Sequence, residues 1–226
     1  NINEIKSRFH NNSVLMGNSR GTYGGEALLN KRNNSVIATK ISPNNLFVDQ
    51  IEQACDSSLR RLSTDFIDLY QIHWPNHNVN LEDSMEVLNK LVEKGKVRSL
   101  GVCNFGVIDL NEILKFSKIT TNQVPYNLLW RPIEHDILPE SKNNNIGMIC
   151  YSPLAQGLLT GRYNSADNVP NGISRSRLFS QYRPLANHDE SGCEEEVFFA
   201  INEIKKISKK ELIELTTNNF NKLFFN

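Results

Sequence analysis

Residues Ser35-Val-Ile-Ala-Thr-Lys40 form a short apolar run that ends in a lysine, and this run predicts a buried β-strand. Between positions 46 and 62 the spacing becomes helical, and apolar side chains recur on one face: Phe47, Ile51, Ala54, Cys55, Leu59 and Leu62. A buried strand followed by an amphipathic helix is the repeating unit of proteins with parallel sheets. This stretch therefore predicts an α/β fold.

The same alternation continues along the chain. We predict further strands at residues 66–74, 97–102, 122–124 and 146–151, with helices at 81–93 and 108–116 between them. Gly95 is expected to end the helix at 81–93. Turn-forming and basic residues dominate positions 157–192, which predicts a long loop ahead of a helix at 193–207. A short helical piece at 209–215 and a tail of asparagine and phenylalanine at 220–226 follow.

Parallel strands need cover on both faces, and a closed barrel or an open sheet with helices on both sides provides it. The periodicity of strands and helices is the same in both architectures. An open dinucleotide-binding sheet carries a G-x-G-x-x-G turn after its first strand, and this sequence has no such turn. The prediction therefore favours the barrel.

Composition excludes several classes of protein. The 25 basic and 25 acidic side chains balance, so no broad positive field favours nucleic acid or an anionic membrane. The four cysteines have neither the paired spacing of a zinc site nor the density of a disulfide scaffold. No run approaches the roughly 18 apolar residues of a membrane span, and the first ten residues lack a secretory apolar core. We expect a soluble, cytoplasmic protein without a metal site.

Five segments, in this order, resemble the aldo-keto reductase family: Val36-Ile-Ala-Thr-Lys40, Asp65-Phe-Ile-Asp-Leu-Tyr-Gln-Ile-His73-Trp-Pro75, Gly101-Val-Cys-Asn-Phe105, Asn122-Gln-Val-Pro-Tyr-Asn127 and Tyr151-Ser-Pro-Leu-Ala-Gln-Gly-Leu-Leu-Thr-Gly161. The resemblance covers about residues 25–207, whereas residues 1–15 and 209–226 diverge from the family. It implies one (β/α)8 TIM-type barrel domain over residues 1–226, incomplete at both ends.

The resemblance also implies a function, the reduction of an aldehyde or ketone to an alcohol by hydride transfer from NADP(H). In the family a tyrosine donates the proton, a lysine and an aspartate tune that tyrosine, and a histidine orients the carbonyl. Lys40 and His73 match the lysine and the histidine. Without the resemblance, Lys40 would fit a solvated lysine at a strand end, and His73 would more often be a structural histidine.

Further positions match the residues with which the family binds its cofactor. Asn104 and Gln123 resemble the side chains that hold the nicotinamide carboxamide, and Cys103 stands where many members carry serine. Tyr151 resembles the ring that stacks on the nicotinamide, and Ser152, Pro153 and Leu154 begin the loop around the pyrophosphate. The basic loop at 174–177 could also approach phosphates, or be solvated.

The tyrosine motif Asp-Thr-Ala-x-x-Tyr-Gly has no full counterpart ahead of Lys40. One alignment uses Tyr23-Gly24, with Asn18 at the acidic position. The other places Met16-Gly17 at the tyrosine and glycine, and spacing favours it. Tyr23 is the only nearby phenol and is our candidate for the catalytic tyrosine. A methionine has no proton to donate, so carbonyl reduction would then be crippled.

Three functions therefore stay open: a carbonyl reductase acting on a small molecule, a nucleotide-binding or interaction module that has lost its chemistry, and a fragment without activity of its own. Strands are missing at both ends of the resemblance, and an open barrel would expose strand edges that favour oligomerisation. A truncated product, completion by another chain, or closure by unfamiliar replacements would each account for this pattern.

Overall fold

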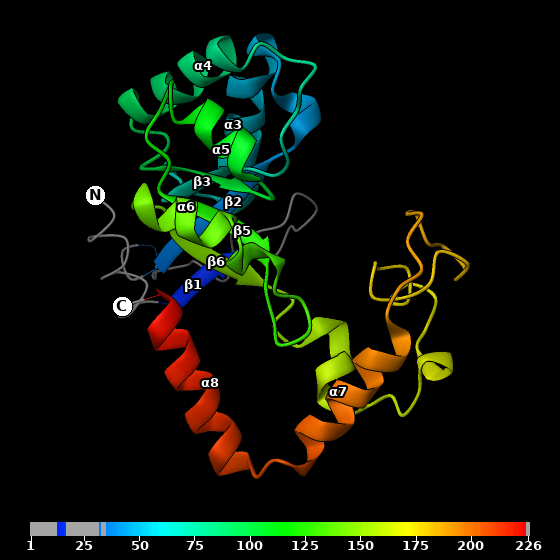
Figure 1. The fold of residues 1–226 in the computed structure, drawn as a ribbon. Helices are drawn as coiled ribbons and strands as arrows, with labels where there is room; N and C mark the ends of the chain where they lie inside the picture. The colour runs from blue at the N-terminus through cyan, green and yellow to red at the C-terminus, as the bar shows by residue number, and fades with distance from the viewer. Residues whose placement is uncertain (1–12, 17–31, 33–34, 225–226) are drawn as a thin grey trace. The chain divides into compact units, whose positions relative to one another are not determined.

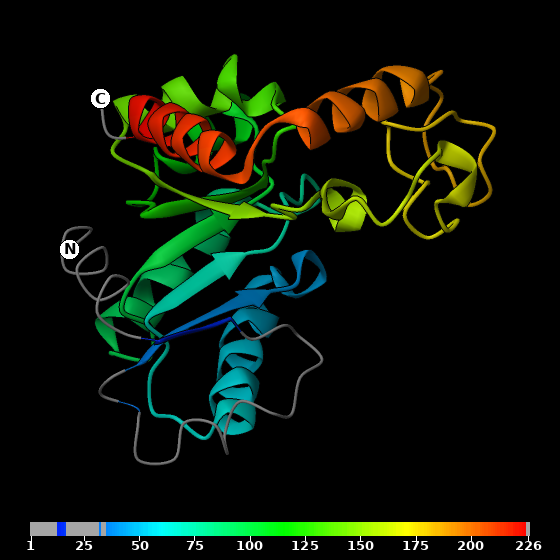
Figure 2. The same ribbon diagram turned by 90° about the horizontal axis from the view of Figure 1, so that it is seen from below.

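The computed structural model describes residues 13–16, 32 and 35–224. Its sheet has six strands in chain order: β1 (Ser13–Met16), β2 (Ser35–Ile41), β3 (Leu69–Ile72), β4 (Leu100–Cys103), β5 (Thr121–Pro125) and β6 (Gly147–Tyr151). The printed pairings from β1 through β5 are all parallel. In Figure 2 the arrows coloured from blue to green run side by side in the same direction. The predicted α/β class is confirmed.

Helices connect successive strands, as the periodicity predicts. The connecting helices are α3 (Val48–Leu62), α4 (Leu81–Glu93), α5 (Val107–Ile113) and α6 (Ile137–Asn143), whereas α7 (Glu194–Lys206) and α8 (Lys209–Phe224) follow the last strand. Gly95 follows the end of α4 in the left-handed conformation (φ +73°), which confirms its expected role. The short helical piece predicted at 209–215 is wrong in length, because α8 continues to Phe224. Within the described residues, no helix is long and apolar enough to cross a membrane.

The chain divides into two compact units. The first unit comprises Asn1–Val124 and Pro132–Ile149, and the second comprises Pro125–Arg131 and Cys150–Asn226. The first unit carries the strands from β1 to β4, all of β5 except Pro125, and the helices α3, α4, α5 and α6. The second carries α7, α8 and the long loop ahead of α7. Each is described by itself below.

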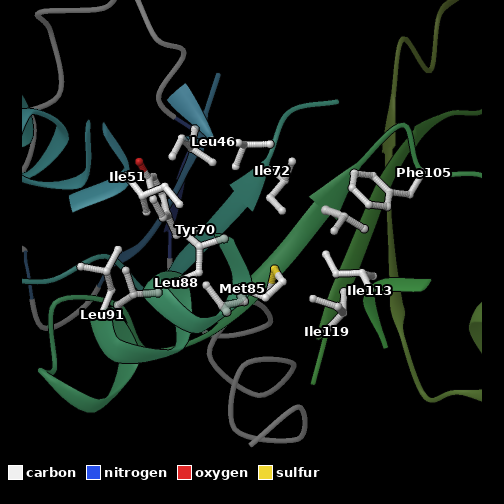
Figure 3. Close-up of a cluster of buried hydrophobic side chains, with 14 of the residues drawn as sticks. Leu46, Ile51, Tyr70, Ile72, Met85, Leu88, Leu91, Phe105, Ile113 and Ile119 are labelled. Carbon is white, nitrogen blue, oxygen red and sulfur yellow. The ribbon is translucent and has the colours of Figure 1, made fainter. Parts of the chain in front are cut away.

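The helices α3, α4 and α5 lie on one side of the strands β2 to β4 (Figure 1), and alternate residues of these strands pack against them in the core of the first unit. Tyr70 and Ile72 of β3 pack with Met85 and Leu88 of α4, and all four are at most 3% exposed (Figure 3). The residues between them in sequence, such as Gln71, project to the opposite face of the sheet. We call this opposite face the inner face, because helices cover the other one.

A cluster of charged side chains joins the amino-terminal ends of β2, β3 and β4. The carboxylate of Asp68, which is 3% exposed, accepts hydrogen bonds from the backbone N–H of Ile37 at 3.0 Å and from Arg98 at 3.0 Å, and it pairs with Arg32 at 2.8 Å. The two guanidinium groups also lie over the ring of Phe66, at 3.7 and 3.8 Å from its centroid. A buried carboxylate thus has two cations and an amide as partners.

In the second unit an ion pair fastens the long loop to α7. Arg183 donates from Nε to Glu194 at 2.9 Å and also from its terminal nitrogen. The same carboxylate accepts from the backbone N–H of Ser180 at 2.9 Å. Gly192, at φ +74°, lies so close to Phe179 that an added Cβ would be 2.3 Å from its carbonyl carbon. The loop therefore has a defined course beside the helix.

Candidate active site

Four strands of the first unit bring the predicted site residues to one edge of the sheet. Lys40 is next to the last residue of β2, His73 follows β3, and Cys103 is the last residue of β4. Gln123 of β5 pairs in register with Cys103. Because the strands are parallel, their carboxyl ends lie at the same edge.

Hydrogen bonds connect these strand ends to one another. The backbone N–H of His73 donates to the carbonyl of Ile41 at 3.0 Å, and the backbone N–H of Asn104 donates to the carbonyl of Gln123 at 2.9 Å. The side-chain amide of Asn104 donates to the carbonyl of His73 and to the sulfur of Cys103, both at 3.2 Å. Asn104 has φ +62°, a left-handed conformation that asparagine tolerates better than most residues. It therefore holds three neighbouring strand ends together.

Burial and the charge of Lys40 set the protonation states at this edge. Burial lowers the pKa of the His73 imidazole, and the Lys40 ammonium lowers it further. Burial raises the pKa of the Cys103 thiol to about 11, and Lys40 partly opposes this shift. At neutral pH the imidazole is therefore uncharged and the thiol keeps its proton. Both groups can donate a hydrogen bond to an oxygen of a substrate or cofactor.

The amide oxygen of Gln123 is buried and has no hydrogen-bond partner among the described residues. The residue is 8% exposed, and its neighbour in register is Cys103. A buried carbonyl oxygen without a donor is costly, and a ligand that carries an N–H group would relieve that cost. A carboxamide, such as that of nicotinamide, supplies an N–H donor of this kind. The residues therefore fit the cofactor that the resemblance implies.

The remaining predicted cofactor residues lie in the second unit, around a pocket of about 180 Å³. Tyr151 and Ser152 line this pocket and are half-buried, whereas Pro153 and Leu154 are exposed. Other residues that line it are Pro125, Asn127, Trp130, Ala155, Gln156, Leu158, Ile173, Ser176 and Leu178. An aromatic ring and several polar side chains in one small pocket suit a flat heteroaromatic ligand.

The backbone after Tyr151 bends sharply. Ser152, Ala155 and Gln156 have φ of 54°, 47° and 54°, and Gly157 has φ 100°. Three residues other than glycine with a left-handed backbone conformation (positive φ) within five positions are uncommon, and such residues are strained. Such strain is frequent where a backbone is shaped around a ligand.

Sequence reasoning missed the side chain that anchors this segment. Asn127 donates from its amide nitrogen to the carbonyl of Ser152 at 3.0 Å, and its amide oxygen accepts from the backbone N–H groups of Leu129 and Trp130. Asn127 ends one of the quoted motifs, but only the contact across to Ser152 reveals what it does. Trp130 lies outside every motif and lines the pocket.

Two other predictions concern the loop at 174–177 and the catalytic tyrosine. Ser176 reaches the pocket, but Arg177 forms an ion pair with Glu190 and Arg175 is exposed. Tyr23 and Asn18 lie outside the described residues. Met16 lies within β1 and pairs in register with Ala38, two residues before Lys40.

Comparison with known proteins gives a consistent result. The sequence model of the aldo/keto reductase family matches residues 16–218. Aldo-keto reductase YhdN of Bacillus subtilis (strain 168) is 32% identical over 212 residues, which cover 89% of this chain and 59% of that protein. Methylglyoxal reductase YeaE of Escherichia coli (strain K12) is 38% identical over 160 residues, covering 70% of this chain and 53% of that protein.

A solved structure also matches. The crystal structure of an aldo/keto reductase from Klebsiella pneumoniae, in complex with NADP and acetate, superimposes with a TM-score of 0.64 at 25% identity. The match covers 99% of this chain and 84% of that one. By contrast, the chain spans only 59% and 53% of the length of the two curated relatives.

Proposed function

The chain belongs to the aldo/keto reductase family, and we propose that it reduces an aldehyde or ketone to an alcohol with NADP(H) as the source of hydride. One observation carries the proposal, namely that Lys40, His73, Cys103 and Gln123 lie at one edge of four parallel strands and that hydrogen bonds connect these strand ends. The parallel strands and connecting helices have the architecture of the family's barrel. The match to the Escherichia coli methylglyoxal reductase favours small aldehydes as substrates.

The side chains of the first unit would divide the work on the substrate. The neutral imidazole of His73 would donate a hydrogen bond to the carbonyl oxygen and so orient it. The ammonium of Lys40 would stabilise negative charge as it develops near that oxygen. Tyr23 is the proposed proton donor, because its phenol is the nearest one ahead of Lys40 in sequence.

The proposed cofactor residues fall into two groups. Asn104 and Gln123 would hold the carboxamide, since the oxygen of Gln123 lacks a donor. Tyr151 would present its ring to the nicotinamide, and the segment from Ser152 to Leu154 would follow the phosphates. NADP(H), when bound, supplies the hydride. The solved Klebsiella pneumoniae relative, a complex with NADP, supports this choice of cofactor.

A second candidate function is nucleotide binding without reduction. Among the described residues of the first unit, the only tyrosine is Tyr70, and it packs in the core on the side of the sheet away from Lys40. If Tyr23 does not approach Lys40, the described part of the first unit offers the carbonyl oxygen no phenol to take a proton from. The protein would then bind the cofactor and leave aldehydes unchanged.

Titration of NADPH, followed by its fluorescence, separates these functions when it is combined with turnover of methylglyoxal and a panel of aldehydes. A reductase binds NADPH and consumes it with substrate, and Lys40→Met keeps the binding but lowers turnover. Gln123→Leu should weaken binding roughly fivefold, because one hydrogen bond contributes about 1 kcal/mol. Binding without turnover would support the second candidate, and no binding at all would refute both.

All four cysteines are free thiols. Free thiols persist in a reducing compartment, so we also propose that the protein works in the cytoplasm.

A further inference from the structure

A second row of residues lies on the inner face, one step below the edge that carries His73, Cys103 and Gln123. In this row Lys40 of β2 pairs in register with Gln71 of β3, and Gln71 pairs with Gly101 of β4. Residues paired in register on parallel strands present their side chains to the same face. Gln71 is therefore the cross-strand neighbour of Lys40.

Glycine at position 101 lets this row pack closely. A Cβ added there would lie 2.4 Å from the hydroxyl oxygen of Thr121 and 3.1 Å from Cγ of Gln71. The side chains of Gln71 and Thr121 thus occupy the space beside Gly101 that a side chain at position 101 would need. Gln71 is 0% exposed as a result.

In the carboxamide of Gln71 the nitrogen is hydrogen-bonded and the oxygen is not. Its amide nitrogen donates to the carbonyl of Val102 at 3.1 Å, which sets the orientation of the group. Its oxygen is buried and has no partner among the described residues. A buried amide oxygen is normally hydrogen-bonded, so we expect a donor near the amide oxygen of Gln71.

The ammonium of Lys40 is a suitable donor for this oxygen. Among the described residues it forms no ion pair. The ionisable groups on the inner face beside it are His73, whose pKa is lowered, and Cys103, whose pKa is raised, so neither bears a charge at neutral pH. On the other side of β2, the described strand β1 (Ser13–Met16) has no ionisable side chain and its register ends at Ala38. The nearest helix, α3, carries Asp49 in its first turn and Arg61 in its last turn, and both residues line a pocket of about 580 Å³ together with Lys40, without forming an ion pair with it.

The two groups are cross-strand neighbours but are not hydrogen-bonded to each other in the structure. We propose that Gln71 is a positioning residue for Lys40, and that its carboxamide oxygen accepts a hydrogen bond from the Lys40 ammonium, in place of a carboxylate, once the flexible lysine side chain turns toward it. The inference deepens the proposed function, because Lys40 is part of the proposed catalytic edge. A neutral acceptor holds the ammonium without cancelling its charge. The full positive charge then acts on His73 and on an oxygen bound beside it.

The first test uses the wild-type protein, with lysine labelled with ¹⁵N. A buried, hydrogen-bonded ammonium exchanges its protons slowly enough to give an NMR signal, and Lys40→Met identifies that signal by its loss. We expect a Lys40 signal, with a nuclear Overhauser contact to the side-chain amide protons of Gln71. A wild-type protein without the signal, or with the signal but without the contact, would overturn the proposal even if no Gln71 variant folds.

Variants then separate positioning from packing. Gln71→Met keeps the volume but has no strong acceptor, so the Lys40 signal should disappear. Thr121→Val is the matched control, since it removes another unpartnered oxygen of the inner face, three strands from β2, and should leave the signal unchanged. A signal that survives Gln71→Met in a folded protein would contradict the proposal.

The charge of the acceptor provides an independent readout. Gln71→Glu should raise the pKa of His73 back toward its ordinary value of 6.5, because the new carboxylate cancels the Lys40 charge that helps to lower it. An unchanged pKa of His73 would refute the argument. None of these measurements needs NADPH binding or turnover, so a failure of the proposed function remains distinguishable from a failure of this inference.

Discussion

Replacing Asp68 by asparagine should destabilise the fold by about 2–4 kcal/mol, a large fraction of the stability of a domain this size. Asparagine has nearly the same shape but carries no charge, and only one of its two terminal atoms can accept a hydrogen bond. Its amide N–H₂ would face a donor group of Arg32 or Arg98. The substitution therefore removes the charge and leaves one cation facing another donor.

The magnitude follows from the exposure of each partner. The side chain of Arg32 is 19% exposed, so its interaction with the 4% exposed carboxylate falls in the range of about 1.5–3 kcal/mol for hydrogen bonds to charged groups. The side chain of Arg98 is 45% exposed, and water screens its pair down to the roughly 0–1 kcal/mol of surface ion pairs. The buried pair thus accounts for most of the expected loss.

Urea denaturation, followed by circular dichroism, measures this loss as a lower midpoint with an unchanged slope. Glu86→Gln is the matched control, because it removes the charge of an exposed pair with Lys90 at 2.6 Å, which water screens, and it should leave the midpoint nearly unchanged. If Asp68→Asn and Glu86→Gln have equal effects, burial does not govern the strength of these pairs and the reasoning is wrong.

Three further outcomes are expected. Leu88→Ala should cost about 2–5 kcal/mol, because the side chain is 1% exposed in the core of the first unit; a loss below about 1 kcal/mol in urea melts would mean that this core collapses around the gap. The pKa of His73, measured by NMR titration, should lie below 6.5 and should rise in Lys40→Met; a value at or above 6.5 in the wild-type protein would contradict this. Because the folded state disfavours the protonated imidazole, the contribution of His73 to stability should be intact above pH 6.5 and decline as the pH falls toward the folded-state pKa. Gly192→Ala should release the long loop, because the added Cβ would clash with the backbone of Phe179. Limited proteolysis should then cut within residues 162–192 faster than in an Asn171→Ala control, and equal rates of cleavage would show that the loop tolerates the side chain.

The strands and helices of the first unit were predictable because their core is built from local periodicity. The helix predicted at 81–93 has those bounds in the structure, since its apolar face, its asparagine cap and its terminal glycine all lie in one short stretch. The end of α8 was not predictable in the same way. Asn218 and Asn219 are typical of turns, yet the helix continues through them. Their intrinsic preference is weak beside the hydrogen bonds of an established helix.

The candidate site shows a similar division. The motifs led to residues at strand ends, because a short motif is enough to mark the end of a strand. The missed residues act through partners distant in sequence. Gln71 is an ordinary strand residue until the register places it beside Lys40, and Asn127 acquires its role only through Ser152, 25 positions later.

The left-handed residues after Tyr151 have a consequence for how tightly a ligand can be held. Ser152, Ala155 and Gln156 keep an unfavourable backbone shape before any ligand arrives, so the cost of ordering this segment is met during folding. Glycine at these positions would remove the strain but would let the unbound segment adopt many backbone conformations. Such a variant would have less backbone strain in the unbound state, but its binding segment would be less preorganised for the ligand.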